Sequence, residues 1–280
     1  MMARPSKTRP LLAIDGDSLA HRAYHGLPKS IRGAGGRPAG ALVGFGNFLM
    51  RLWDAEQPAA VLVGWDSLDS PTYRNEALPG YQAGRAFDQA ILEQLATLPA
   101  LVEAFGFVAA KAPGYEADDF LAAAAAAWDG PVVVATSDRD AFQLVTDRVT
   151  VLQPVKGVSE LARIGPAEVR ERYGVDPAQV PDFIALRGDA SDRIPGAPGV
   201  GPKTAADILA QYGTLEAALG AGRFSAIADD LRLYRRVAQM DAAAPLPPVL
   251  EHEPDWARAE TKARELGLNA LANRLGERIG

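Results

Sequence analysis

The sequence contains no cysteine, which removes several kinds of chemistry at once. Disulfides, thiolate zinc sites and cysteine nucleophiles are excluded, and a chain without thiols fits a reducing compartment. No apolar run approaches the roughly 20 residues of a membrane-spanning helix. The basic N-terminal segment MMARPSKTRP lacks the long apolar stretch and the cleavage site of a signal peptide. We therefore expect a protein of the cytoplasm without a membrane partner.

The chain is also short of positive charge. It has 29 Lys and Arg against 35 Asp and Glu, a net charge of −6. Nucleic-acid-binding proteins tend to be basic, so this balance argues weakly against such a partner. Two divalent cations bound by an acidic site would cancel about four of the negative charges. Any affinity for nucleic acid must then come from a local basic patch.

Short apolar segments alternate with amphipathic helical segments in the first half of the chain. This alternation predicts an α/β fold with a mainly parallel central sheet covered by helices on both faces. The expected strands are residues 11–15, 60–65, 107–111, 132–136 and 149–152, and the expected helices are 41–56, 89–105, 117–128 and 140–146.

After residue 152 the pattern predicts helices only. They are expected at residues 166–173, 177–187, 203–212 and 228–240, followed by a proline-rich extended stretch and one more helix from residue 257. We therefore predict an α/β domain over residues 1–160 and a helical region over residues 161–280.

Nine carboxylates fall on short motifs where a strand ends or a helix begins. Three of them follow apolar runs: LLAID ends in Asp15, VLVGWD in Asp66 and VVVATSD in Asp138. Ligands gather at the carboxyl ends of strands in open α/β sheets, and so many acids in one crevice need cations. Oxygen ligands without thiols indicate Mg²⁺ or Mn²⁺, and a carboxylate-walled site for two or more such ions is typical of phosphodiester hydrolysis. The other acids are Glu116, Asp118, Asp119, Asp140, Asp189 and Asp192.

Each acidic motif also has a simpler reading. Asp15 can cap the helix that follows it, and acids in a first helical turn are favoured by the helix dipole. Capping needs one or two acids, whereas EADD supplies three. Loop capping can likewise explain TSDRD or GDASD alone. The coincidence of all these motifs favours a metal site.

The segment PGAPGVGPKTAADILAQYG predicts a helix–hairpin–helix turn that binds DNA. Free backbone N–H groups at a helix start, beside a lysine, can hold a phosphate without reading bases. It is not a P-loop, because Pro202 stands where lysine must directly follow glycine. The alternative is a plain glycine turn between helices. The candidate DNA contacts are Gly199, Gly201, Lys203 and Thr204.

Two further motifs carry cations and aromatic rings that suit nucleic acid. One follows the first strand at helical spacing, and the other lies in a segment punctuated by glycine and proline. The alternatives are ordinary packing for the first and a solvated loop for the second. The candidate residues are Arg22, Tyr24, His25, Arg74, Tyr81 and Arg85.

The motifs EADD, TSDRD, GDASD and GVGPKT, in this order, resemble the bacterial 5′→3′ exonuclease/flap endonuclease family. That family includes the nuclease domain at the start of bacterial DNA polymerase I and its stand-alone relatives, and the likeness runs from about Leu11 to Met240. The resemblance implies a PIN-like 5′-nuclease fold and metal-dependent cutting of DNA at 5′ ends and 5′-flap junctions in replication and repair. The implied partner is DNA with 5′ flaps, nicks, gaps or 5′ ends. The implied cofactors are two or three Mg²⁺ or Mn²⁺ ions, with K⁺ at the helix–hairpin–helix turn.

The same resemblance implies roles for single residues. Arg22 and Arg85 would steer the scissile phosphate. The first metal site would be formed by Asp15, Asp66, Glu116, Asp118 and Asp119, and the second by Asp138, Asp140, Asp189 and Asp192.

Three departures from the family pattern affect the expected activity. Gln82 stands where the family has a lysine that neutralises the scissile phosphate, which puts the rate in doubt. Arg193 stands where Asn or Gly is common, and it is a further candidate phosphate contact. Few residues separate Gln82 from the next expected helix near Asp88, so an arch over a single-stranded flap would be small or mobile. No polymerase region follows, which indicates the stand-alone form.

Two other functions fit parts of the sequence. Asp15-Gly16-Asp17-Ser18 and Gly188-Asp189…Asp192 resemble the motifs of haloacid-dehalogenase-type phosphatases, but that reading leaves EADD, TSDRD and the glycine turn without roles. A non-catalytic DNA-binding relative is the other alternative, because Gln82 replaces the usual lysine. A ribonuclease of the related PIN class would lack the DNA-gripping turn.

Overall fold

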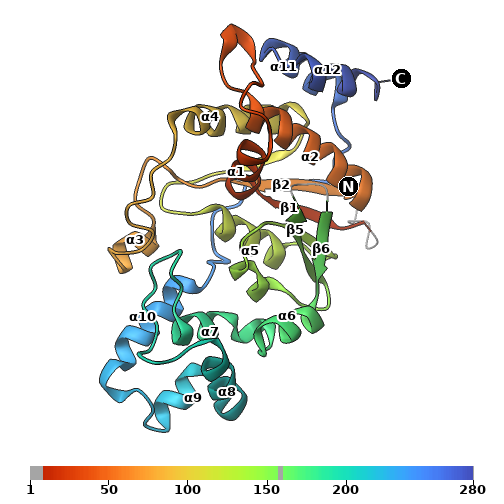
Figure 1. The fold of residues 1–280 in the computed structure, drawn as a ribbon. Helices are drawn as coiled ribbons and strands as arrows, with labels where there is room; N and C mark the ends of the chain where they lie inside the picture. Colours follow the sequence, from red (N-terminus) through yellow and green to blue (C-terminus); the bar gives the residue numbers. More distant parts are fainter. Residues whose placement is uncertain (1–8, 157–159, 280) are drawn as a thin grey trace.

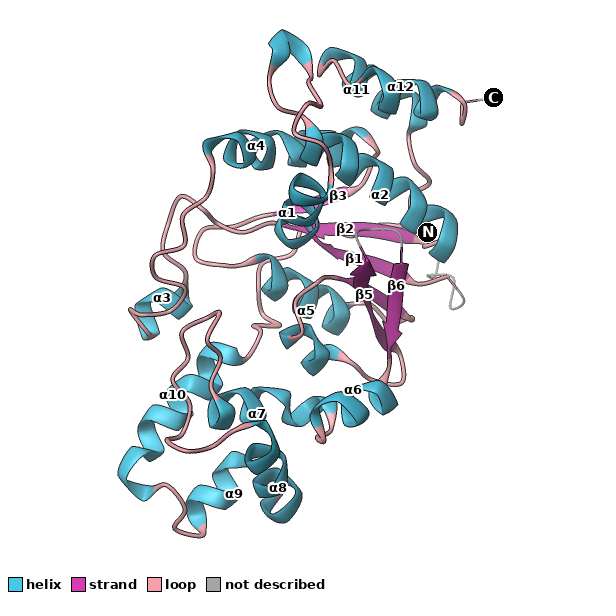
Figure 2. Cartoon of the chain, viewed as in Figure 1, coloured by secondary structure: helices cyan, strands magenta, loops and turns pink. Residues whose placement is uncertain are grey.

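The computed structural model describes residues 9–156 and 160–279, so most of the basic N-terminal segment lies outside the described residues. One six-stranded sheet has the order β3-β2-β1-β4-β5-β6 (Figures 1 and 2). Strands β1 to β5 pair in parallel, and β6 is antiparallel to β5. The order reverses beside β1, and ligands bind at such a switch point in open α/β sheets. The strands are β1 Leu11–Asp15, β2 Ala60–Gly64, β3 Val108–Ala110, β4 Val132–Ala135, β5 Val149–Lys156 and β6 Glu160–Ile164.

The expectation of helices only after residue 152 was wrong. Strand β5 continues to Lys156, and β6 adds an antiparallel edge strand. Of the five residues in β6, only Ile164 is buried. An edge strand with so little burial has no apolar run that the sequence could reveal.

Helices cover both faces of the sheet. Figure 1 shows α1, α2, α4, α11 and α12 above it and α5 below it, with α6 to α10 forming a separate helical region. The predicted helix at residues 140–146 is a short 3₁₀ turn, and the predicted C-terminal helix is two helices. The helices are α1 Gly16–Gly26, α2 Gly40–Glu56, α3 Tyr73–Ala77, α4 Gln89–Ala104, α5 Ala117–Ala127, α6 Pro166–Tyr173, α7 Val180–Arg187, α8 Pro202–Tyr212, α9 Leu215–Gly220, α10 Ala228–Ala238, α11 Trp256–Glu265 and α12 Asn269–Gly276. The 3₁₀ turns are η1 Ala34–Gly36, η2 Asp140–Leu144, η3 Pro177–Gln179 and η4 Ser225–Ile227. Within the described ranges, no helix has the length and apolar character to cross a membrane.

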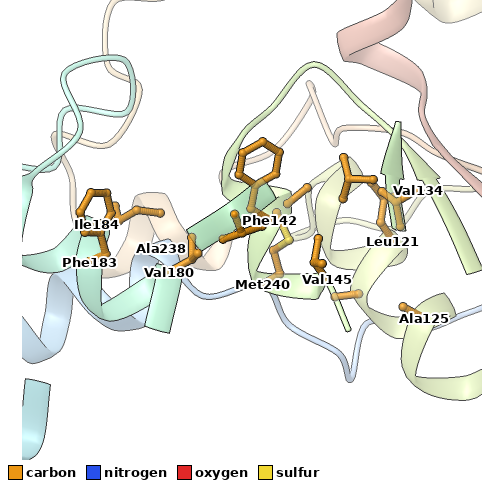
Figure 3. Close-up of a cluster of buried hydrophobic side chains, with 14 of the residues drawn as sticks. Leu121, Ala125, Val134, Phe142, Val145, Val180, Phe183, Ile184, Ala238 and Met240 are labelled. Atoms are coloured by element: carbon orange, nitrogen blue, oxygen red, sulfur yellow. The ribbon is translucent and has the colours of Figure 1, made fainter. Parts of the chain in front are cut away.

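The sheet is buried on both faces, which explains why its strands are continuous apolar runs. Leu12 and Ile14 of β1 belong to the core beneath α1, α2 and α4, whereas Leu11 and Ala13 face the core on the α5 side. This second core continues into the helical region without a break. Figure 3 shows part of it, from Val134 on β4 to Phe183 on α7. The apolar packing therefore holds the helical region against the sheet.

After α10 the chain returns to the sheet. The backbone N–H of His252 donates to Ala59 O at 3.0 Å, and α11 and α12 then pack on α4 and α2. Near the two ends of the described chain, Arg9 lies 5.8 Å from the ring centroid of Trp53, and Arg278 forms an ion pair with Asp54. Both ends of the described chain therefore lie at α2. The helical region, α6 to α10, is connected to the sheet domain at its start by β6 and at its end by the segment that leads to α11. The division at residues 160 and 161 stays a prediction.

Candidate active site

Eight of the nine predicted carboxylates line one cleft of ≈ 560 Å³. Asp15 ends β1, Asp66 follows β2 and Asp138 follows β4, so three neighbouring strands each deliver one acid to the same edge of the sheet. The other predicted acids of the lining come from the start of α5, from η2 and from the turn after α7. They are Glu116, Asp118, Asp140, Asp189 and Asp192.

Asp15 is held in place by the chain around it. It is the N-cap of α1 and accepts hydrogen bonds from Ser18 N at 2.9 Å and from Thr136 Oγ1 at 2.7 Å. Burial, followed by the charge of Asp66, raises the pKa of Asp15 to about 7. Asp66 in turn accepts from Ala117 N at 2.8 Å, which links the acid after β2 to the first residue of α5.

The three acids at the start of α5 have different environments. Burial raises the pKa of Glu116 to about 7. Oδ2 of Asp118 lies 3.2 Å from Arg74 Nη2, while Oδ1 of Asp118 is buried with no hydrogen-bond partner. Asp119 is fully buried and lies outside the cleft lining, and both of its carboxylate oxygens accept from Arg74 at 2.8 and 2.9 Å. Both oxygens are thus engaged in the wall in this structure, and the role of Asp119 as a metal ligand stays a prediction.

Three predicted DNA contacts are buried instead of facing solvent. Arg74 is 1% exposed and is bonded to the acids of α5, and the Tyr81 hydroxyl lies 3.1 Å from Glu116 Oε2. The Tyr24 hydroxyl donates to Asp88 Oδ2 at the start of α4. These side chains are bonded within the protein in this structure, and their role as DNA contacts stays a prediction.

The second group of acids surrounds η2 and the turn after α7. Asp140 N donates to Asp138 Oδ1 at 2.9 Å. Burial and the neighbouring charge of Asp138 raise the pKa of Asp140. Although burial opposes it, hydrogen bonding from Ser191 holds the pKa of Asp189 below its usual range. Arg85 forms an ion pair with Asp192 at 2.9 Å, and the Arg85 side chain is 42% exposed.

These residues fit a site for hard cations. A buried carboxylate oxygen without a hydrogen-bond partner is costly, and a bound cation would satisfy Oδ1 of Asp118. The raised pKa values of Asp15 and Glu116 show that the cleft favours bound protons or cations over bare charge. In residues 9–156 and 160–279, no three of these side chains converge closely enough to hold one ion as they stand.

Gln82 and Arg85 lie on one wall of the cleft. The amide Nε2 of Gln82 donates to Asp192 Oδ1 at 3.1 Å and to the Tyr81 hydroxyl at 2.8 Å. The wall therefore has a neutral amide where the family pattern has a cation. Arg193 is exposed on the neighbouring turn, outside the cleft lining.

On α1, Arg22 is half-buried and outside the lining of the cleft, and His25 is exposed.

The sequence interpretation missed several other residues that line the cleft. Asp17 could have been found from its position two residues after Asp15, and its Oδ2 accepts from Asp66 N at 2.8 Å. His21, at helical spacing with Arg22 and His25, also lines the cleft. The others have no clear signal in their local sequence: Ser18, Phe87, Ser137, Arg139, Tyr173 and Arg187.

The glycine turn lies outside the cleft, at the start of α8. Gly199 has a φ of 75°, a backbone conformation that favours glycine. Gly201 caps α8, and Lys203 and Thr204 are exposed in its first turn. The turn is therefore open to a ligand.

Family models match nearly the whole chain. The model described as 5′-3′ exonuclease, N-terminal resolvase-like domain, matches residues 10–174, and the model described as 5′-3′ exonuclease, C-terminal SAM fold, matches residues 175–261. A protein of Streptomyces coelicolor named 5′-3′ exonuclease is 35% identical over 295 residues, covering 94% of this chain and 98% of that protein. DNA polymerase I of Mycobacterium tuberculosis is 43% identical over 219 residues, covering 75% of this chain. That match spans only 24% of the polymerase.

Solved structures share the fold at low sequence identity. The zinc-bound T5 5′-exonuclease has a TM-score of 0.68 at 19% identity and covers 97% of this chain and 98% of that chain. The catalytic core of Rad2 in complex with DNA substrate has a TM-score of 0.61 at 16% identity, with 99% and 94% covered. These similarities establish the predicted arrangement, an α/β sheet with a helical region.

Proposed function

The chain belongs to the 5′-3′ exonuclease family, and from this membership we propose that it is a structure-specific 5′ nuclease. It hydrolyses DNA phosphodiesters at 5′ ends and at 5′-flap junctions, in DNA replication and repair. The observation that carries the proposal is the convergence of eight carboxylates from three strand ends and three further segments on one cleft. No phosphatase motif explains the acids from α5 and η2.

The acids of the cleft would hold Mg²⁺ or Mn²⁺. Such ions, when bound, activate water and stabilise the leaving oxygen. One group, Asp15, Asp66, Glu116 and Asp118, lies at the ends of β1 and β2 and the start of α5. The other group is Asp138, Asp140, Asp189 and Asp192.

Arg85 would orient the scissile phosphate. Its guanidinium is partly exposed at the rim, and among the described residues its ion pair is with Asp192 alone, so a phosphate can compete for it. Gln82 can donate one hydrogen bond to the same phosphate but adds no charge. The reaction would therefore depend more on Arg85 than in relatives that carry lysine at this position.

The exposed turn at Gly199 and Gly201 would hold the DNA duplex through its phosphates, with K⁺ at the turn. Lys203 and Thr204 flank it at the start of α8. We expect the protein to act in the cytoplasm, on 5′ flaps and on nicked or gapped duplexes.

The test is cleavage of a 5′-flap DNA labelled at its 5′ end, with Mn²⁺, Mg²⁺ or EDTA. The chain is compared with Asp138→Asn and with Asp229→Asn, whose side chain is 98% exposed on α10. We expect metal-dependent products near the junction from the unmodified chain and from Asp229→Asn, and none from Asp138→Asn.

Two other outcomes would point elsewhere. Flap binding without cleavage in either metal would favour a non-catalytic relative, an alternative supported by the neutral Gln82. Hydrolysis of small phosphomonoesters without action on DNA would favour a phosphatase.

A further inference from the structure

Arg74 is a buried cation with a full set of partners. Its guanidinium reaches all three acids at the start of α5: Nη1 lies 3.3 Å from Glu116 Oε2, Nη2 lies 3.2 Å from Asp118 Oδ2, and two hydrogen bonds hold Asp119. Arginine suits this place because its planar fork presents five donors in fixed directions. Arg85, in contrast, is partly exposed and, within the described residues, pairs with one acid, Asp192.

The same pair of residues also holds the end of α10. Arg74 Nε donates to Val237 O at 3.0 Å, and Asp241 N donates to Asp119 Oδ1 at 2.8 Å. The Tyr73 hydroxyl lies 3.0 Å from Asp119 Oδ1 and 3.2 Å from Gln239 O. Residues 237–241, where the chain leaves the helical region, are therefore bonded to the residues that orient the acids of the cleft.

We propose that Arg74, together with Asp119, is a positioning residue that orients Glu116 and Asp118 for metal and fixes the helical region relative to them. This inference rests on the proposed nuclease function. Arg74 holds one oxygen of Asp118 and leaves the other free for a cation. Asp119 accepts hydrogen bonds from Arg74, from the Tyr73 hydroxyl and from the backbone N–H groups of Glu116 and Asp241. The pair thereby sets the distance from the duplex-binding turn to the bond that is cut.

A metal ligand depends on the groups that orient it. Loss of such a partner typically costs 10–100-fold in metal affinity. Lysine at position 74 would keep the charge but could not reach three carboxylates and Val237 O at once. Glu116 and Asp118 would then rotate, and the end of α10 would lose a hydrogen bond.

The experiment compares Arg74→Lys and Tyr73→Phe with a matched control, Arg232→Lys. Arg232 lies on α10, is 47% exposed in its side chain and pairs with Glu216 and Asp229, away from the cleft. Mn²⁺ affinity is measured by isothermal titration without DNA, and product lengths are measured on a 5′-labelled flap. Arg74→Lys is expected to bind Mn²⁺ about tenfold more weakly and to spread its products over neighbouring bonds. Tyr73→Phe should shift both readouts in the same direction by less, and Arg232→Lys should match the unmodified chain.

A purely structural role would give a different result. If Arg74→Lys lowers only the melting temperature, with Mn²⁺ affinity and product lengths unchanged, the proposal is wrong. Weaker Mn²⁺ binding with unchanged product lengths would overturn the link to the helical region. If Arg74→Lys does not fold, Tyr73→Phe decides, because it keeps the ring and loses only the hydroxyl contacts to Asp119 and Gln239. If the unmodified chain binds Mn²⁺ but cuts nothing, the nuclease function fails, while the Mn²⁺ affinities still test Arg74.

Discussion

Gln82 joins two turns at the rim of the cleft, its own turn before α4 and the turn after α7 that contains Asp192. It bonds to both the backbone and the side chain of Asp192 and stands beside the partly exposed Arg85. Lysine fits the same backbone, because the φ of 49° at this position is already accommodated for a residue with a side chain. The position therefore offers a direct way to test how much one charge contributes to the rate.

Gln82→Lys should raise the single-turnover cleavage rate by about tenfold, with flap affinity changed less than about twofold. The reason is that a positioned cation stabilises charge that develops on the phosphate in the transition state. Rapid-quench kinetics and a binding titration in Ca²⁺ would measure the two quantities separately. Gln82→Met is the control for removing the amide without adding charge. Equal rates for the lysine and methionine variants would show that no cation is needed here.

Asp15 and Glu116 make the metal-free protein sensitive to pH. Their pKa values are about 7 in the folded chain, against ordinary values of 3.8 and 4.5. The folded state thus keeps protons that the unfolded state would release, so these two groups lower the free energy of unfolding as pH rises from about 4 through about 7. A divalent cation replaces those protons, and we expect Mn²⁺ to raise the melting temperature more at about pH 8 than at about pH 5. Thermal melts with Mn²⁺ or EDTA at both pH values test this, and a shift that is larger at the lower pH would contradict it.

Single residues of the site were predictable where the position of their motif at the end of a strand also determines where the side chain lies. Asp15, Asp66 and Asp138 follow buried strands, so the sheet itself brings them together. Arg74 and Tyr81 lie in a segment that reads as a solvated loop, but the segment folds inward because Glu116, Asp118 and Asp119 need a counter-charge. Burial that depends on a distant partner leaves no mark in the local sequence.

Among the elements of the site, β2 and α5 approach each other closely. A Cβ atom at Gly64 would lie 2.5 Å from the carbonyl oxygen of Ala117 and 3.2 Å from Phe120 Cβ. Backbone atoms cannot move aside as a flexible side chain can. The absence of a side chain at the end of β2 therefore allows the first turn of α5 to reach the cleft.

Gly64→Ala should push the first turn of α5 outward. We expect a loss of about 1–3 kcal/mol in the free energy of unfolding, together with weaker Mn²⁺ binding, since Glu116 and Asp118 move with that turn. Urea unfolding and isothermal titration measure the two effects. Gly220→Ala, at the end of α9 with open space around its Cβ position, is the control and should change neither. Full Mn²⁺ affinity in Gly64→Ala would mean that α5 tolerates the shift.

The elements were predictable in proportion to their burial. The strands β1, β2 and β4 are fully buried and read as apolar runs, whereas β6 has one buried residue and was missed. The short helix α3 was missed because its five residues, YRNEA, carry no apolar face. Its position is set by Arg74 reaching the acids of α5, which is a tertiary effect.

At the scale of the whole molecule, the cleft and the glycine turn are separate surfaces held by one continuous core. Lys203→Ala should weaken duplex binding about equally for every DNA sequence. It should also reduce the slope of log affinity against log salt concentration by about one, because one phosphate contact is lost. Lys262→Ala on α11, a helix that packs on α4, is the matched control and should have no effect. Duplex titrations at several salt concentrations would show this. A loss confined to particular sequences would refute the phosphate role of Lys203.

The layered fold followed from the alternating pattern, but the route of the last forty residues did not. The return of the chain depends on single contacts, such as His252 N to Ala59 O, that no periodicity encodes. The proline-rich stretch before α11 is predicted to be extended, but an extended segment could equally lead away from the sheet or back to it. Only the structure shows that it leads back to the sheet.

The meeting of both chain ends at α2 has a practical consequence for single-molecule work. Arg9 lies near Trp53 and Arg278 pairs with Asp54, on the part of the molecule that lies away from α8 to α10 (Figure 1). A surface tether or a fluorescent reporter attached beside Arg9 or Arg278 would therefore sit next to α2 and leave the helical region facing the solution. Immobilised molecules should keep their access to long DNA, whichever end is used for attachment.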